Sequence, residues 1–345
     1  MNDNLISDVL RSKGFGSNVQ SVAENENAHV LRIQSPTGEG YMTLYMVMKG
    51  VYVMFDEFHL ESCESEFKNM ENVFCIDHCR QGRIEHENLL GNKFYMESGD
   101  LKLGRRINHS GRIHMPNGNY YGMTIGFEIG EAEKSIKNEF PGIDIDIKSI
   151  VDKFSSSGKA IVSDKNNFAA EEYFIRRDSL LKNDEYIDHI LSEMYNIPKE
   201  IRMDLFKVKI MELLLRLKML DKTLYKDERL YIPASQAEKI KEVHKLIIDS
   251  PDKNYTVEAL SQMFNIPEST LRKNFREIYG SPIYKYIKKY KINKAAELLR
   301  TDSNLKISDV AESVGYDNPS KFAAAFKDVM GLTPLEYKQK KVTVQ

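Results

Sequence analysis

The stretch GYDNPSKFAAAFKDVMGLTPLEY, from Gly315 to Tyr337, carries the signals of one well-defined helix. Asn318 can accept hydrogen bonds from unpaired N–H groups of the first turn, and Pro319 is favoured there because its missing N–H would have no partner. Gly331 is the residue type that ends helices in the left-handed conformation. Apolar residues recur at helical spacing and predict one buried face: Phe322, Phe326 and Val329.

A second copy of this pattern lies upstream. Leu271, Phe275 and Gly280 match residues of the first stretch at a constant offset of 51. A shorter helical pattern precedes each copy at an offset of 50, with Val257, Leu260 and Phe264 matching Ile307, Val310 and Val314. Two helices joined by a short turn are typical of a helix-turn-helix motif. The repeat therefore predicts two such motifs, at residues 256–280 and 307–331.

These motifs resemble the DNA-binding domain of the AraC/XylS family of bacterial transcription regulators. The residues that carry the resemblance are Ile307-Ser308-Asp309-Val310-Ala311, Val314-Gly315-Tyr316, Phe322, Phe326-Lys327, Gly331 and Thr333-Pro334. Ser261 and Ala323-Ala324 depart from the family pattern. The resemblance implies a sequence-specific regulator, an activator, that binds double-stranded promoter DNA and contacts RNA polymerase.

The second helix of each motif is the expected recognition helix. Arg side chains can bond both acceptors of a guanine, and Ser or Lys can reach base edges in the major groove. The base-reading candidates are Ser269, Arg272, Lys273, Ser320 and Lys321. Cations near the helix ends and on the connecting helix are candidates for phosphate contacts: Arg276, Lys288 and Lys327.

Charge is distributed unevenly along the 345 residues, whose formal net charge is −2. Residues 235–345 contain 19 Lys and Arg against 14 Asp and Glu, whereas residues 1–234 contain 30 against 37. The basic part can approach phosphates, and the acidic part is expected to stay off DNA. The sequence shows no apolar run of membrane-spanning length and no signal peptide, so we expect a cytoplasmic protein without a membrane partner.

Residues 28–129 contain many short segments rich in β-branched and aromatic residues, separated by glycines, which favours an antiparallel barrel or sandwich. Within them, Arg80-Gln81-Gly82-Arg83-Ile84-Glu85 followed by Gly99-Asp100-Leu101 resembles the cupin-like sensor domain of many AraC-type regulators. The predicted fold is therefore α+β with two domains: an N-terminal cupin-like barrel and an all-α DNA-binding domain.

A small-molecule effector is expected in the barrel, because such barrels enclose one small ligand. The interior should be methionine-rich, which suits apolar or irregular ligands. Polar groups in or near it are the candidate ligand-binding residues: Arg83, Glu85, Tyr95 and Tyr121.

A metal- or redox-responsive regulator is the alternative hypothesis, because the barrel region contains Cys63, Cys75 and Cys79 together with His59, Asp77, His78, His86, His109 and His114. The cupin H-x-H signature is absent, and three cysteines fit a reducing compartment as ordinary buried thiols. We therefore predict no metal site and no cofactor.

Residues 167–220 return to a helical period. One stripe is expected to contain Phe174, Leu181, Ile187, Ile190, Leu191 and Met194, and a second helix is apolar around much of its circumference. The apolar surplus around Leu213, Leu214 and Leu217 predicts a homodimer contact. The expected domains are a sensor at 1–160, a helical dimerisation segment and linker at 161–230, and a DNA-binding domain at 235–345.

Two enzyme classes compete with the regulator hypothesis. A cupin-type enzyme fused to a DNA-binding module needs a metal triad or another set of catalytic residues, and the sequence contains no recognisable motif of either kind. A DNA-repair methyltransferase with this kind of motif needs a zinc-binding cysteine cluster, but the chain has three cysteines and no C-x-x-C. We therefore expect a protein without enzymatic activity.

Overall fold

The computed structural model describes residues 18–24, 28–65, 70–87, 91–106, 111–154, 172–225, 230–302 and 304–342. The chain divides into two compact units, one of residues 1–90 and 94–230 and the other of residues 91–93 and 231–345. An expected helix at Leu5–Ser12, the boundary loop at Ser155–Gly158 and His109 lie outside the described residues.

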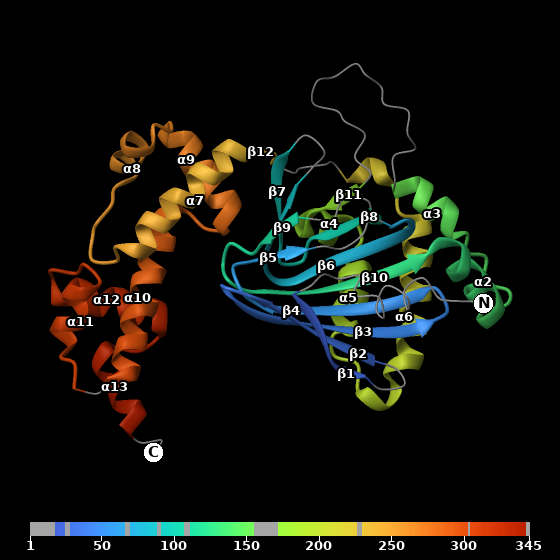
Figure 1. Ribbon diagram of the computed structural model, residues 1–345, viewed down its shortest axis with the longest axis horizontal. Helices are drawn as coiled ribbons and strands as arrows, with labels where there is room; N and C mark the ends of the chain where they lie inside the picture. The colour runs from blue at the N-terminus through green and yellow to red at the C-terminus, as the bar shows by residue number, and fades with distance from the viewer. Residues whose placement is uncertain are drawn as a thin grey trace. The chain divides into compact units, whose positions relative to one another are not determined.

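The first unit combines an antiparallel sheet with helices (Figure 1). Its strands are β1 (Val19–Glu24), β2 (Ala28–Ser35), β3 (Gly38–Met48), β4 (Val51–His59), β5 (Ser62–Ser65), β6 (Met70–Glu87), β7 (Asn92–Glu97), β8 (Leu101–Arg106), β9 (Gly111–His114), β10 (Tyr120–Glu128) and β11 (Glu172–Ile175). Its helices are α2 (Ile129–Glu139), α3 (Ile147–Phe154), α4 (Arg177–Asn183), α5 (Glu185–Met194), η1 (Lys199–Ile201), α6 (Arg202–Met219) and η2 (Lys222–Leu224).

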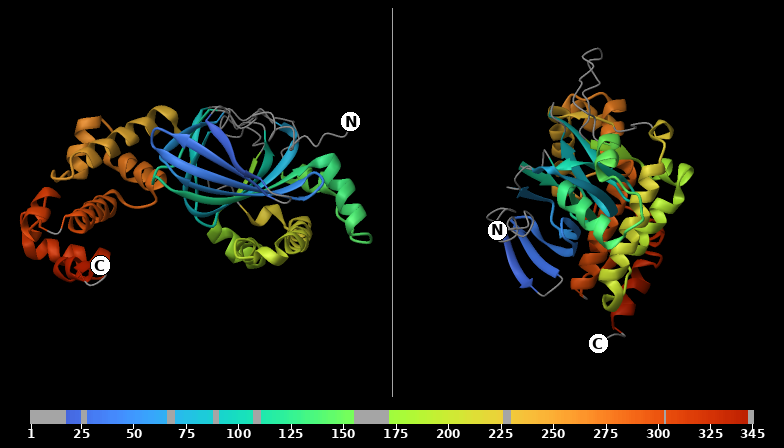
Figure 2. Two further views of the ribbon diagram at one scale, coloured as in Figure 1. Left: turned by 60° about the horizontal axis from the view of Figure 1, so that its bottom comes forward. Right: turned by 90° about the vertical axis from the view of Figure 1, so that its right-hand side faces the viewer.

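The described strand pairs of the main sheet are antiparallel, as the sequence predicts. Its path runs β1-β2-β3-β4-β10-β6-β7, with β8 paired to β6 and β11 paired to β8, while β5 and β9 form a separate ladder. Among the described strands this path is open, so the sheet is curved without the closure expected of a barrel (Figure 2).

Helices α5 and α6 lie side by side across one face of this sheet (Figure 2). Side chains alternate between the two faces of a strand, so every second residue of β10 points toward the helices. Met123, Ile125 and Phe127 accordingly share a buried cluster with Ile190 of α5 and Leu214 of α6. Removing these apolar surfaces from water is the main term that holds the helices on the sheet.

Two expectations for residues 167–220 were wrong. Phe174 belongs to β11, which pairs with β8, so it is not part of a helical stripe, and Leu181 is 41% exposed. Leu213, Leu214 and Leu217 are fully buried within the unit, because the sheet and neighbouring helices cover them. Their apolar character therefore gives no reason to expect a dimer contact at these three residues.

The second unit is helical after the short β12 (Ile232–Pro233). Its helices are α7 (Ala234–Asp249), α8 (Val257–Phe264), α9 (Glu268–Tyr279), α10 (Ile283–Thr301), α11 (Ile307–Ser313), α12 (Pro319–Met330) and α13 (Pro334–Val342). Phe322 and Phe326 of α12 pack with Ile292 of α10 and Val310 of α11 in one buried cluster. In the first half of the unit, α7 packs on α9 through the stacked rings of His244 and Tyr279, whose centroids are 4.2 Å apart.

In the part of the chain that the structure describes, no helix combines the length and apolarity required to cross a bilayer.

Candidate functional site

The pair α8 and α9 has helix-turn-helix geometry. The Thr256 hydroxyl caps α8 by accepting a hydrogen bond from the Ala259 amide at 3.1 Å. The helix ends at Asn265, which adopts the left-handed conformation with φ 49°. Ser261, the departure from the family pattern, donates its hydroxyl proton to the Ile266 carbonyl at 2.6 Å. This bond satisfies a buried turn carbonyl and fixes the tight turn between the helices.

Helix α9 separates a buried face from an exposed one. Leu271, Phe275 and Ile278 are fully buried. The four predicted contact residues of this helix are all exposed, and their spacing of three and four residues places them on one face: Ser269, Arg272, Lys273 and Arg276. Arg272 pairs with Glu268, one turn earlier, at 2.9 Å. An exposed pair of this kind contributes at most about 1 kcal/mol, so Arg272 can exchange it for a guanine.

The pair α11 and α12 repeats the arrangement. The Asn318 side chain accepts hydrogen bonds from the amides of Ser320 at 2.9 Å and Lys321 at 3.0 Å, which confirms the predicted cap. Gly331 ends α12 with φ 74°. Ser320, Lys321 and Lys327 are exposed on the side opposite the buried phenylalanines.

Apolar side chains occupy part of the α12 outer face. Ala324 is exposed and Ala323 is half-buried. Alanine can contact a thymine methyl but donates no hydrogen bond, so this face offers fewer polar contacts to bases than the face of α9.

Lys288 lies on α10 and reaches across to α12. Its Nζ is 2.8 Å from Oδ2 of Asp328, and this hydrogen bond raises the pKa of Lys288 and lowers that of the aspartate. The lysine is therefore charged and held against α12. The predicted phosphate contact of Lys288 requires that it leave the aspartate or share it.

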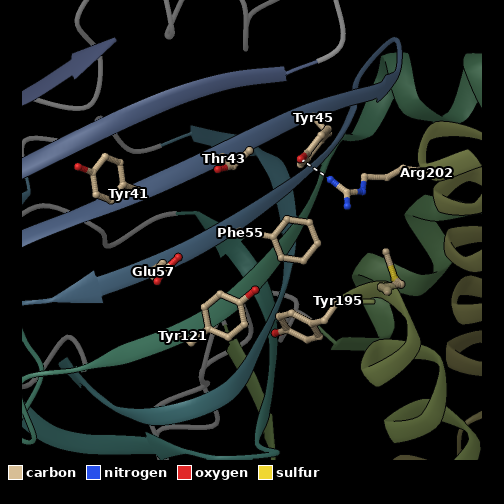
Figure 3. Close-up of a pocket in the computed structure, with 9 residues that line it drawn as sticks. Tyr41, Thr43, Tyr45, Phe55, Glu57, Tyr121, Tyr195 and Arg202 are labelled. Atoms are coloured by element: carbon tan, nitrogen blue, oxygen red, sulfur yellow. Dashed lines mark hydrogen bonds between the residues drawn. The ribbon is translucent and has the colours of Figure 1, made fainter. Parts of the chain in front are cut away.

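The first unit contains a pocket of about 170 Å³ between the sheet and the helices (Figure 3). Five aromatic rings line it, from β3, β4, β10 and the end of α5: Tyr41, Tyr45, Phe55, Tyr121 and Tyr195. Glu57, Arg202, Thr43 and Met194 complete the lining. Burial raises the pKa of Tyr195 far above its ordinary value, so this phenol stays protonated.

Of the four predicted ligand-binding residues, only Tyr121 lines this pocket. The other three are buried elsewhere in the unit. Tyr95 donates to Oε2 of Glu85 at 2.6 Å, and Arg83 forms an ion pair with Glu97. The four residues therefore do not form one site. Tyr121 belongs to the pocket wall, whereas Arg83, Glu85 and Tyr95 are buried polar residues outside the pocket.

The cysteines Cys63, Cys75 and Cys79 are buried free thiols. Burial raises the pKa of Cys63 to about 11 and that of Cys79 further still, which disfavours the reactive thiolate at neutral pH. Among the described residues, no group of three His, Cys, Asp or Glu side chains is arranged to hold a metal ion. Neither observation supports the metal- or redox-responsive alternative.

Sequence reasoning missed several residues at both sites. Glu268 could have been found, because it lies four residues before Arg272 on the same helix. Asp328 lies 40 residues from Lys288, and Arg202 lies 157 residues from its partner Tyr45, so no local pattern reveals these pairs.

Comparison with known families agrees with the geometry. Residues 260–340 match the family model described as "Helix-turn-helix domain". The chain is 33% identical over 89 residues to an AraC-like transcription regulator of Streptomyces lividans. This match covers 26% of this chain and 29% of the relative. It is 30% identical over 91 residues to the HTH-type transcriptional activator RhaR of Pectobacterium atrosepticum, covering 26% of this chain and 32% of the relative. These matches span about a third of the relatives' length.

Part of the chain is also similar to solved structures. The C-terminal domain of AraT, a response regulator from Geobacillus stearothermophilus, is 28% identical with a TM-score of 0.28, covering 30% of this chain and 84% of that chain.

Proposed function

On the premise that residues 260–340 form a helix-turn-helix domain like those of AraC-like regulators, we propose that the chain is a sequence-specific DNA-binding transcription regulator. The observation that carries the proposal is the repeated pair of helices α9 and α12, each ended by a glycine in the left-handed conformation and each with a buried phenylalanine and an exposed polar face. A regulator of this kind needs no catalytic residues, so the proposal includes no enzymatic activity.

Base reading is assigned to Ser269, Arg272 and Lys273 on α9 and to Ser320 and Lys321 on α12. The planar guanidinium of Arg272 can bond O6 and N7 of one guanine. Phosphate contacts are assigned to Arg276, Lys288 and Lys327, which release counterions and make binding salt-dependent. The family matches with a transcriptional activator support activation through RNA polymerase at a promoter.

The test is a selection of DNA from a random double-stranded library by the full chain. We expect a recurring sequence, bound with an affinity that falls steeply as salt rises. Recovery of no preferred sequence, with weak binding that is equal for all duplexes, would reject the regulator function.

We assign effector sensing to the first unit and propose that this unit has a cupin-like fold. The aromatic-walled pocket against α5 and α6 supports a small-molecule site, because hydroxyl groups and two side chains of opposite charge converge there. It lies on the helix-covered face of the sheet, where a bound molecule would contact both layers.

A homodimer is proposed through α6, by residues other than those first expected. Val208 and Leu215 of α6 and Ile201, which directly precedes the helix, repeat every seven residues, Met219 follows four later, and all four are at least 40% exposed. This spacing places them along one side of the helix, as in a two-helix contact. Sedimentation of the full chain should show a dimer at tens of micromolar, and Val208→Glu with Leu215→Glu should give monomers.

The matched control is Leu181→Glu, on α4, because Leu181 is 41% exposed but lies on another helix. A wild-type monomer at these concentrations, or equal dissociation by the control, would exclude the α6 contact.

A further inference from the structure

Two side chains of opposite charge stand at opposite ends of the pocket in the first unit. Figure 3 shows Glu57 at one end and Arg202 at the other, with Phe55 between them. The register of the sheet places Tyr41 and Tyr121 directly beside Glu57 on the two neighbouring strands. The carboxylate is therefore flanked by two phenol rings, an arrangement that attracts an organic cation.

Arg202 is held rigidly and still has donors to offer. Its Nε and Nη2 donate to the Ile197 carbonyl at 3.2 and 2.9 Å, and its Nη1 donates to the Tyr45 hydroxyl at 2.7 Å. A guanidinium has five N–H groups. One on each Nη therefore has no hydrogen-bond partner among the described residues, and two such donors suit a carboxylate.

We propose that this pocket binds a small zwitterion whose ammonium and carboxylate stand at opposite ends of an apolar or aromatic body, of which an ω-amino acid is the simplest kind. Arg202 receives the carboxylate, Glu57 receives the ammonium, and the rings enclose the body. Glu57 also contacts the exposed His59 at 3.2 Å, a contact that the ammonium would replace. This assignment rests on the proposed effector function.

The test uses three matched probes with the full chain: 4-(aminomethyl)benzoate, benzylamine, which lacks the carboxylate, and benzoate, which lacks the ammonium. At millimolar concentration 4-(aminomethyl)benzoate should raise the melting temperature by mass action, and each singly charged probe should bind about tenfold more weakly. Glu57→Gln should remove the advantage of 4-(aminomethyl)benzoate over benzoate, and Arg202→Met should remove its advantage over benzylamine.

Glu61→Gln, at an exposed carboxylate outside the pocket lining, is the control and should leave all three affinities unchanged. Failure of 4-(aminomethyl)benzoate to bind at millimolar concentration, or equal binding of the three probes, would overturn the assignment. DNA selection by the same preparation, measured without probes, tests the regulator function separately.

A different observation concerns the second unit, where three segments meet at one lysine. Lys291 of α10 is 4% exposed, and its Nζ donates to the Lys253 carbonyl at 3.0 Å and to Oδ1 of Asn254 at 2.7 Å. Asn254 in turn donates to the Gly315 carbonyl at 3.0 Å. Residues 250–256 join α7 to α8, whereas Gly315 lies in the turn between α11 and α12. The lysine thus links the loop that leads into the first helix-turn-helix to the turn of the second.

Gly315 is constrained by the same contact. Its φ is +74°, and a Cβ there would lie 2.3 Å from the Asp252 carbonyl oxygen and 2.8 Å from Nζ of Lys291. Both the backbone conformation and the close approach require glycine. Burial of the ammonium lowers the pKa of Lys291, while Asp252 and Asp317 oppose that shift.

We infer that Lys291 is a positioning residue that fixes the second helix-turn-helix relative to the first, and so restricts the separation of the two DNA segments that α9 and α12 can contact together. This inference rests on the proposed DNA binding. Each inserted base pair rotates the second segment by about 35° around the DNA axis, so a rigid connection should tolerate no insertion.

The test compares full-chain variants on the selected DNA with one or two base pairs inserted or removed between the two contacted segments. Wild type should lose binding steeply with each change. Lys291→Met should bind the original spacing about tenfold more weakly and all spacings nearly equally. Asn254→Ala, at an exposed residue that is less prone to unfold the domain, should flatten the profile in the same direction.

Lys289→Met is the control, because Lys289 is an exposed lysine of the same helix outside this contact. The inference would be overturned if both test variants keep the wild-type dependence on spacing, or if the control flattens it equally. Absence of any selected DNA for wild type would instead reject the proposed function.

Discussion

Helices α9 and α12 share a scaffold and differ in what they expose. Phe275 and Phe326 occupy matching positions and are fully buried. Gly280 and Gly331 end the helices with nearly equal φ values of 76° and 74°. The repeat is therefore preserved where packing and backbone conformation require particular residues.

The exposed faces follow no such requirement. Helix α9 presents Arg272, Lys273 and Arg276, whereas the outer face of α12 includes Ala324 between Lys321 and Lys327. A guanidinium can bond two acceptors of one base, and alanine can bond none. The comparison shows that the two helices are equivalent in folding, and it predicts that they are unequal in reading DNA, with α9 reading more sequence.

The largest expected effect concerns the shared scaffold. Phe275→Ala and Phe326→Ala should each destabilise the second unit by about 3–5 kcal/mol, because each leaves a cavity in a packed core. Chemical unfolding of the full chain, followed by a probe of the second unit, measures this. Leu335→Ala, at a residue 53% exposed, is the control with little expected change. A strong effect at only one phenylalanine would break the equivalence of the two motifs.

Arg272→Ala addresses the unequal faces directly. It should cost about 1–3 kcal/mol of binding at the selected sequence and relax the preference at one base pair, while non-specific binding changes little. Lys321→Ala should have a smaller effect on base preference, because a lysine lacks the rigid fork. Binding to a set of single-base changes provides the measurement, and the assignment is reversed if only the Lys321 variant alters base preference.

The helix caps should show a graded difference. Asn318 accepts two amide hydrogen bonds and Thr256 accepts one, so Asn318→Ala should destabilise its motif by about 1 kcal/mol and Thr256→Ala by somewhat less. Thermal unfolding of the two variants tests this order. Asn318→Asp keeps the acceptor and should retain most of the stability, and a loss equal to that of alanine would argue against capping.

The smallest expected effect is at Lys288. Lys288→Ala should weaken binding to all sequences alike and reduce the salt slope by about one, if the lysine contacts one phosphate. Asp328→Asn keeps Lys288 but removes the carboxylate that pairs with it, so this variant should bind DNA with slightly higher affinity. Titrations at several salt concentrations separate the two variants, and an unchanged slope for Lys288→Ala would remove this residue from the phosphate contacts.

Local signals made the second unit predictable from sequence. The cap at Asn318, the glycine at Gly331 and the helical spacing of Phe322 and Phe326 all act within a few residues. The exposed candidate residues of α9 and α12 follow from the same periodicity, although their contacts with DNA remain predictions.

Non-local pairing explains what could not be predicted in the first unit. Strand β11 has only four residues and depends on β8, about 70 positions earlier in the chain. Leu213 was expected on a surface and is buried, because a helical pattern does not reveal how many neighbours cover a helix. Arg202 and Glu57 come together in one pocket only through the packing of α6 on the sheet.

A footprint of the full chain on its selected DNA tests the central claim most directly. If α9 and α12 both enter the major groove, chemical probing of guanine N7 should show two protected segments about one helical turn apart, with the stronger protection at the segment lost in Arg272→Ala. One protected segment, unchanged by Arg272→Ala, would contradict the account.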